Sequence, residues 1–170
     1  MSIIKKILLN FLIFSFWLTT YSHSEELKKL GTYKDWQAIL IYNDGGKVCF
    51  AQSKPVLQSP KKDDREARLF VTFRPEEKIM DEVSTTSGYE YNSQNSITGA
   101  SGKSKFKFDI SQDNFAWISS NKIEKKIIKR MKKASRLMVT AYNQSGSQTI
   151  DHYSLMGFTK AYNTAKKSCS

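Results

Sequence analysis

Apolar and polar residues alternate through much of the chain after its first two dozen positions. The clearest case is residues 103–111, where Phe106, Phe108 and Ile110 stand at every second position with charged residues between them. Successive side chains of a β-strand point to opposite faces, so this pattern predicts a strand with one buried and one wet face. Further strands are predicted at residues 34–42, 47–53, 68–74, 78–86, 115–118, 136–142 and 147–155, with short strands joined by turns between 88 and 104.

Two segments follow the helical period of 3.6 residues instead. Residues 121–134 carry apolar side chains on one face and basic side chains on the other, which predicts an amphipathic helix. Asn121 is expected to cap it, with Glu124 three residues later as in a capping box. A second helix is predicted after a turn at Gly157. The apolar stripes of the two helices are Ile123, Ile127, Ile128 and Met131, and then Phe158, Ala161, Tyr162 and Ala165.

These elements predict a mainly β fold without βαβ alternation. About eight to nine strands with two short helices indicate an antiparallel β-sandwich or a partly closed barrel, the helices lying over one end or face. Residues 43–46 and 143–146 contain the Gly and Asn that tight hairpin turns favour. The polar residues 25–32 are expected to form a loose entry segment. Residues 54–66, with two prolines and the charge run Lys61–Glu66, are expected to form an exposed, solvated loop.

The N-terminus has the organisation of a secretory signal peptide. Lys5 and Lys6 precede an apolar run from Ile7 to Leu18, and small residues lead up to Ser24. The alternative is an uncleaved membrane anchor, but the run is short for a span of about 20 residues. We therefore expect a signal peptide at residues 1–24 and a single domain at residues 25–170, in a periplasmic or secreted protein.

Export determines which partners the net charge favours and whether the cysteines are expected to pair. Without the leader, 25 basic residues face 16 acidic ones, a net charge of +9 that favours anionic partners such as lipid headgroups and acidic glycans over nucleic acid. In an oxidising compartment Cys49 and Cys169 are expected to pair, with two free thiols or an intermolecular bridge as the alternatives. Without residues 1–24, two distant cysteines and a single histidine, His152, do not suit a zinc site. No cofactor is expected.

The basic helix is the candidate binding surface. Its polar face can contact an anionic bilayer or another polyanion. The alternative is that its apolar face packs on the sheet, while the basic residues only keep the helix soluble. The candidate contacts are Lys122, Lys125, Lys126, Lys129, Arg130, Lys132 and Lys133.

A hydrolase is the third hypothesis, suggested by Asp151 and His152. Adjacent residues of a strand point to opposite faces, so these two side chains cannot form the base and orienting acid of a triad together. The sequence also lacks a Gly-x-Ser-x-Gly nucleophile elbow. We predict no catalytic residues.

Short motifs spread over the chain resemble the invasion-associated locus B family in their order. They are Asp35-Trp36, Cys49 with Ser53-Lys54-Pro55, Arg74-Pro75, Gly88-Tyr89, Ala116-Trp117, Arg130–Ser135 and the run from Ser145 to Ala161. The signature positions within them are Trp36, Gly88, Tyr89, Trp117, Thr149, Asp151, Tyr153, Ser154, Leu155, Gly157 and Phe158.

The resemblance implies a small all-β protein of the alphaproteobacterial periplasm or secretome. It implies no catalytic residues that can be transferred to this chain. Some members carry a further cysteine pair before the basic helix, and residues 113–118 contain none here. The expected role is non-enzymatic, with an envelope component or an anionic surface as partner.

Overall fold

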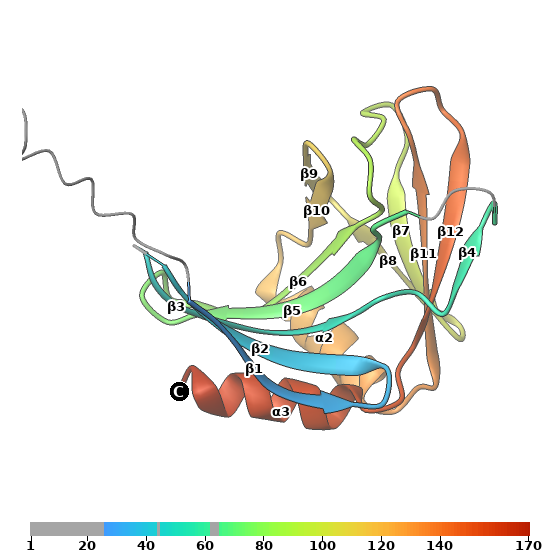
Figure 1. Ribbon diagram of the computed structural model, residues 1–170. Coiled ribbons are helices and arrows are strands. Elements are labelled where there is room, and N and C mark those ends of the chain that lie inside the picture. Colours follow the sequence, from blue (N-terminus) through green and yellow to red (C-terminus); the bar gives the residue numbers. More distant parts are fainter. Residues whose placement is uncertain (1–25, 44, 62–64) are drawn as a thin grey trace, which may run out of the picture.

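Two antiparallel sheets and two helices make up the part of the protein that the structure describes (Figure 1). The computed structural model describes residues 26–43, 45–61 and 65–170, so the expected signal peptide lies outside the described residues. The predicted mainly β, antiparallel fold is confirmed, and the two sheets of the described residues do not close into a barrel. The described residues form twelve strands, more than the eight to nine predicted.

The larger sheet has seven strands in the order β1-β2-β3-β5-β6-β10-β9. Their bounds are β1 (Glu26–Tyr33), β2 (Trp36–Asn43), β3 (Gly46–Ser53), β5 (Arg68–Arg74), β6 (Ile79–Thr86), β9 (Ile110–Gln112) and β10 (Phe115–Trp117). The smaller sheet has the order β4-β12-β11-β7-β8. Its strands are β4 (Leu57–Ser59), β7 (Ile97–Ser101), β8 (Ser104–Phe108), β11 (Arg136–Tyr142) and β12 (Gln148–Ser154).

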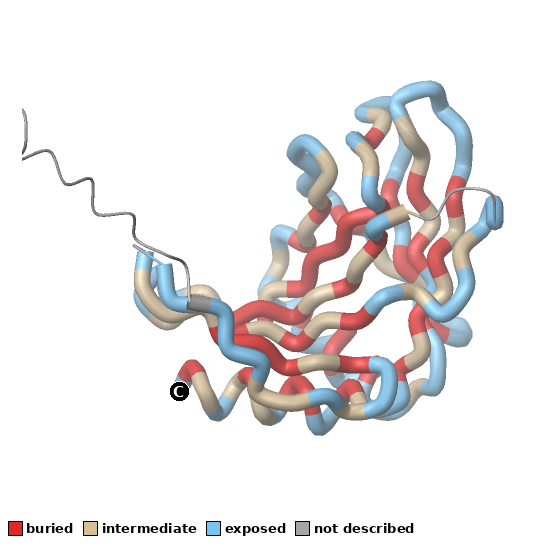
Figure 2. The backbone as a smooth tube through the Cα atoms, viewed as in Figure 1, coloured by how far each residue is buried: buried red, intermediate tan, exposed pale blue. Residues whose placement is uncertain are grey.

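The helices cover the inner face of the larger sheet. Helix α2 (Asn121–Met131) packs on β6, and α3 (Phe158–Ser168) runs beneath β1, β2 and β3 (Figure 1). The ring of Trp36 meets the ring of Phe158 edge to face, with centroids 4.8 Å apart. One continuous core follows, and buried residues alternate with more exposed ones along strands of both sheets (Figure 2).

The C-terminal helix is fixed at both ends. At its start, Gly157 has a φ of 92°, and a Cβ there would lie 1.8 Å from the carbonyl oxygen of Tyr33, so only glycine lets the chain pass the β1–β2 hairpin. At its end, Cys169 forms a disulfide with Cys49 of β3, their Cα atoms being 5.9 Å apart. The predicted intramolecular pairing is confirmed.

Several sequence-based expectations about the elements are wrong, including the loop predicted at residues 54–66, which contains strand β4. Residues 26–33 form strand β1, because backbone pairing with β2 compensates for their polar sequence. The strand predicted at 103–111 breaks at Asp109, and Ile110 joins the other sheet as an exposed residue of β9. The cap of α2 is Ser120, and the Glu124 carboxylate accepts a hydrogen bond from the backbone N–H of Val83 at 2.8 Å, so no capping box forms.

Candidate anionic-ligand site

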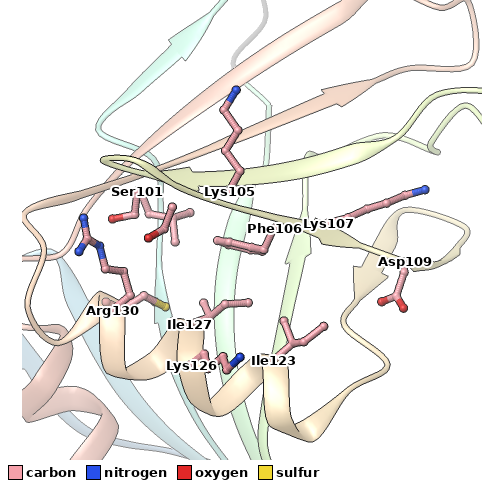
Figure 3. Close-up of a pocket in the computed structure, with 12 residues that line it drawn as sticks. Ser101, Lys105, Phe106, Lys107, Asp109, Ile123, Lys126, Ile127 and Arg130 are labelled. Carbon is pink, nitrogen blue, oxygen red and sulfur yellow. The ribbon is translucent and has the colours of Figure 1, made fainter.

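A groove of about 440 Å³ lies between helix α2 and strand β8, the edge strand of the smaller sheet (Figure 3). Its walls are mainly apolar, and basic residues stand at its rim. The volume falls in the range typical of small-molecule sites, roughly 300–1,000 Å³. The apolar wall residues are Phe106, Ile123, Ile127, Met131 and Leu137, and the charged ones are Lys105, Lys107, Lys126, Arg130 and Asp109.

The strand side of the groove follows from the alternation of β8. Phe106 points toward the helix, while Lys105 and Lys107 on either side of it point away (Figure 3). The Phe106 ring lies directly over Gly99 of β7, where a Cβ would stand 2.1 Å from the ring carbon Cζ. Any larger residue at position 99 would collide with the ring, so glycine is needed there. The two lysines suit an edge strand, where charged side chains hinder pairing with other chains.

The apolar stripe of α2 forms the helix side of the groove. The sheets cover only part of this stripe. Ile127, Ile128 and Met131 are buried, as the packing alternative predicted, but Ile123 is 43 % exposed. Ile123 and Ile127 rise from the helix on the side of Phe106 (Figure 3). The sheet and helix thus leave apolar surface open between them, and a ligand with an apolar part can bury it.

The cations that face this opening are Lys126 and Arg130, one helical turn apart. Among the described residues, no carboxylate oxygen lies within 4.0 Å of either side chain's nitrogens. The one acidic lining residue, Asp109, stands at the opposite end of the groove from Arg130 (Figure 3). It accepts hydrogen bonds from the backbone N–H and the hydroxyl of Ser119, which lower the pKa of Asp109.

Only two of the seven predicted basic contacts belong to the groove. Lys126 and Arg130 line the groove, whereas Lys122, Lys125, Lys129, Lys132 and Lys133 do not. Lys132 places its ammonium 3.8 Å from the ring centroid of Tyr162 on α3, a cation–π contact. Burial lowers the pKa of Lys132, and neighbouring Lys166 adds to the effect.

The signature positions lie outside the groove, and several of them surround a buried ion pair. Arg65 Nη2 donates to Asp151 Oδ1 at 2.7 Å and Arg65 Nη1 donates to Asp151 Oδ2 at 3.1 Å. The two side chains are only 8 % and 1 % exposed. Arg65 Nη1 also donates to the Ser87 carbonyl at 3.0 Å, and the guanidinium lies 5.6 Å from the Tyr89 ring centroid. The expectation that Arg65 belongs to a solvated charge run is wrong, because its partner is distant in sequence.

Tyrosines complete this buried cluster. The hydroxyl of Tyr89 bonds to that of Thr149, and the hydroxyl of Tyr91 donates to Ser87 Oγ at 3.3 Å. The Tyr153 hydroxyl is buried without a hydrogen-bond partner among the described residues. Burial raises the pKa of all three tyrosines. The cluster is closed to solvent at Asp151 and Tyr153, and it joins strand β12 of the smaller sheet to the segment that leads into β5 of the larger sheet.

The remaining signature positions are structural as well. Trp36 Nε1 donates to the carbonyl of Ser154 at 2.8 Å, which links β2 to the end of β12. Leu155 is buried, and its backbone N–H donates to the Ser135 carbonyl at 2.9 Å. Trp117 stacks on Phe115 with ring centroids 5.9 Å apart. None of these residues lines the groove between α2 and β8.

Sequence reasoning missed the apolar half of the candidate site. Phe106 was expected in the core, and Ile123 was expected to pack on the sheet. The available signal was the width of the apolar stripe on α2, which spans both Ile123 and Ile128. The position of β8 beside that stripe is not readable from the sequence.

Comparison with protein families gives one match. The family described as Invasion associated locus B (IalB) protein matches residues 36–166, most of the chain. No curated protein and no solved structure matches the chain significantly. Neither helix in the described part of the chain is long and apolar enough to cross a membrane.

Proposed function

The chain belongs to the invasion associated locus B family, and on that premise we propose that it is a non-enzymatic binding protein of the bacterial envelope. The proposed ligand is anionic and binds in the groove between α2 and β8. The proposed location is the periplasm or the exterior, after removal of residues 1–24.

The observation that carries the binding role is the pairing of Lys126 and Arg130 with an open apolar wall. No carboxylate of the described residues lies within 4.0 Å of these two cations, and they therefore favour an anion by direct Coulomb attraction. Arginine adds a planar fork that matches carboxylate or phosphate oxygens. Insertion of the whole apolar face of α2 into a bilayer is disfavoured, because Ile127, Ile128 and Met131 already pack inside the protein.

The non-enzymatic role is supported by where the titratable groups lie. Asp151 is fully buried in its pair with Arg65. His152, its neighbour on β12, points to the other face of the sheet. A substrate therefore meets no acid, base and nucleophile converging on one point around these residues.

Export is supported by the N-terminal charge and apolar pattern and by the disulfide between Cys49 and Cys169. Intact-mass measurement of the protein isolated from its native host tests the leader. A chain that begins at Glu25 is expected. A retained residue 1–24 segment would contradict the proposed cleavage.

Co-sedimentation with vesicles tests anionic binding. The exported protein is expected to bind vesicles of phosphatidylglycerol, not vesicles of phosphatidylcholine, and to dissociate as salt shortens the screening length from about 10 Å at 0.1 M. Absence of binding to phosphatidylglycerol at low salt would reject the proposal.

A matched pair of double variants separates the groove from the general charge of α2. Lys126→Gln with Arg130→Gln removes the two helix cations that line the groove, whereas Lys125→Gln with Lys129→Gln removes the same charge from helix residues outside it. The first pair is expected to weaken binding to the vesicles more than the second. Equal losses would instead support the whole basic face of the helix as the contact surface.

A further inference from the structure

We propose that the groove binds one acyl chain of an anionic amphiphile, with the acidic head at Arg130 and Lys126 and the chain along the apolar wall. This inference rests on the proposed function and names the ligand class for the same site. It favours a lipid-like ligand over a glycan, the other class that a basic helix suggests.

The apolar wall of the groove does not suit a glycan or an inorganic anion. Phe106 closes one side, while Ile123 and Ile127 close the other (Figure 3). A sugar presents hydroxyls that lose their hydrogen bonds to water against such a wall, which costs free energy. Methylene groups gain free energy in the same place. The pairing of an apolar wall with two cations therefore selects an amphiphile.

The charges also give the ligand a direction. Arg130 stands at one end of the groove near Ser101, and Asp109 stands at the other (Figure 3). The guanidinium of Arg130 lies against Gly102, where a Cβ would be 2.7 Å from Nη2. An acidic head is attracted to the Arg130 end and repelled from the Asp109 end.

The size of the groove suits a single chain. Ile123 and Arg130 are seven positions apart on α2, a distance of about 10 Å along the helix axis at the usual rise per residue. The volume of about 440 Å³ holds one medium-length chain, and decanoate is therefore a suitable probe. A diacyl lipid would enter with one chain and keep the other in its membrane.

Calorimetric titration of the exported protein tests the ligand class with three probes below their micelle concentrations. Decanoate is expected to bind. Acetate, which has the head without the chain, and decyl maltoside, which has the chain without the charge, are each expected to bind at least about tenfold more weakly, because either lacks one half of the interaction. Decyl maltoside binding as tightly as decanoate would overturn the role of the cations.

Failure of this inference is distinguishable from failure of the proposed function. Binding to phosphatidylglycerol vesicles without binding to decanoate would overturn the acyl-chain site and leave the anionic contact in place. Loss of both would reject the two together.

Ile123→Asn tests the wall without disturbing the core, because Ile123 is 43 % exposed. Decanoate affinity is expected to fall about fivefold with the loss of a partly exposed apolar side chain. Met138→Asn on β11 is the matched control, since Met138 is 39 % exposed and lies outside the groove. It is expected to change affinity less than about twofold, and equal effects of the two variants would contradict the site.

Discussion

Arg65 and Asp151, 86 positions apart in the sequence, form a buried bidentate ion pair. Arg65 precedes β5 of the larger sheet, and Asp151 stands in β12 of the smaller one. Gln58 of β4 supports the pair by donating to Asp151 Oδ1 and to the Arg65 carbonyl, both at 3.2 Å. The contact therefore joins the segment that leads into one sheet to strand β12 of the other.

Asp151→Asn is expected to lower the free energy of unfolding by about 3–5 kcal/mol, because it leaves the Arg65 charge buried without a counter-ion. Urea unfolding followed by tryptophan fluorescence measures the change. Glu77→Gln is the control, since Glu77 pairs with Arg74 at 3.1 Å but is 53 % exposed, and such pairs contribute about 1 kcal/mol or less. Similar losses in the two variants would show that the buried pair does not stabilise the fold.

Glu124 gives the protein a pH-dependent stability. Burial raises the pKa of Glu124 to about 7, and the neighbouring carboxylates of Glu82 and Asp81 add to the shift. The folded state therefore binds a proton more tightly than the unfolded state, whose pKa stays near 4.5. This contribution to stability is present below pH 4.5 and is lost as the pH rises through 7, up to about 3 kcal/mol.

Glu124→Gln keeps an oxygen for the Val83 N–H and removes the titration. The variant is expected to match the parent protein near pH 4.5 and to be more stable than it at pH 8, by about 1–3 kcal/mol. Denaturant unfolding at several pH values gives the difference directly, because other titrating groups cancel between the two proteins. A difference that does not grow with pH would contradict the raised pKa.

Removing the disulfide is expected to destabilise the domain. The bridge between Cys49 and Cys169 spans 120 positions of sequence, for which loop-closure entropy gives about 5 kcal/mol as an upper value. A Cys49→Ser, Cys169→Ser variant is expected to lose about 2–5 kcal/mol in urea unfolding. Parent protein under a reducing agent provides the matched comparison, and unchanged stability in both would contradict the expected role.

Strands whose alternate residues pack in the core were predictable from the sequence, whereas strands held mainly by pairing with a neighbour were not, and the strong alternation of residues 103–111 did not show the break at Asp109. Residues 68–74 and 136–142 form strands with the predicted bounds, because their own apolar faces meet the core. Strand β1 has few apolar residues on either face, and its strand conformation depends on hydrogen bonds with β2. Strand β4 has three residues between prolines and depends on β12 in the same way.

The contacts that matter for the site join distant segments, which explains why the sequence revealed only half of it. The basic residues of α2 were visible as a charge pattern, but Phe106 becomes a wall only because β8 lies beside the helix. Arg65 shows the same limit. Asp151 lies on the same strand face as Thr149 and Tyr153, and all three are buried. A buried acid requires a cationic or hydrogen-bonding partner, but the sequence does not show which residue that is.

Titration of decanoate into protein labelled at isoleucine methyl groups tests the central claim most directly, because NMR shifts report the place of binding. The account predicts saturable shifts at Ile123 and Ile127, which line the groove, with Ile79 and Ile110 of the larger sheet unchanged. Shifts confined to isoleucines outside the groove, or no shifts at all, would contradict it.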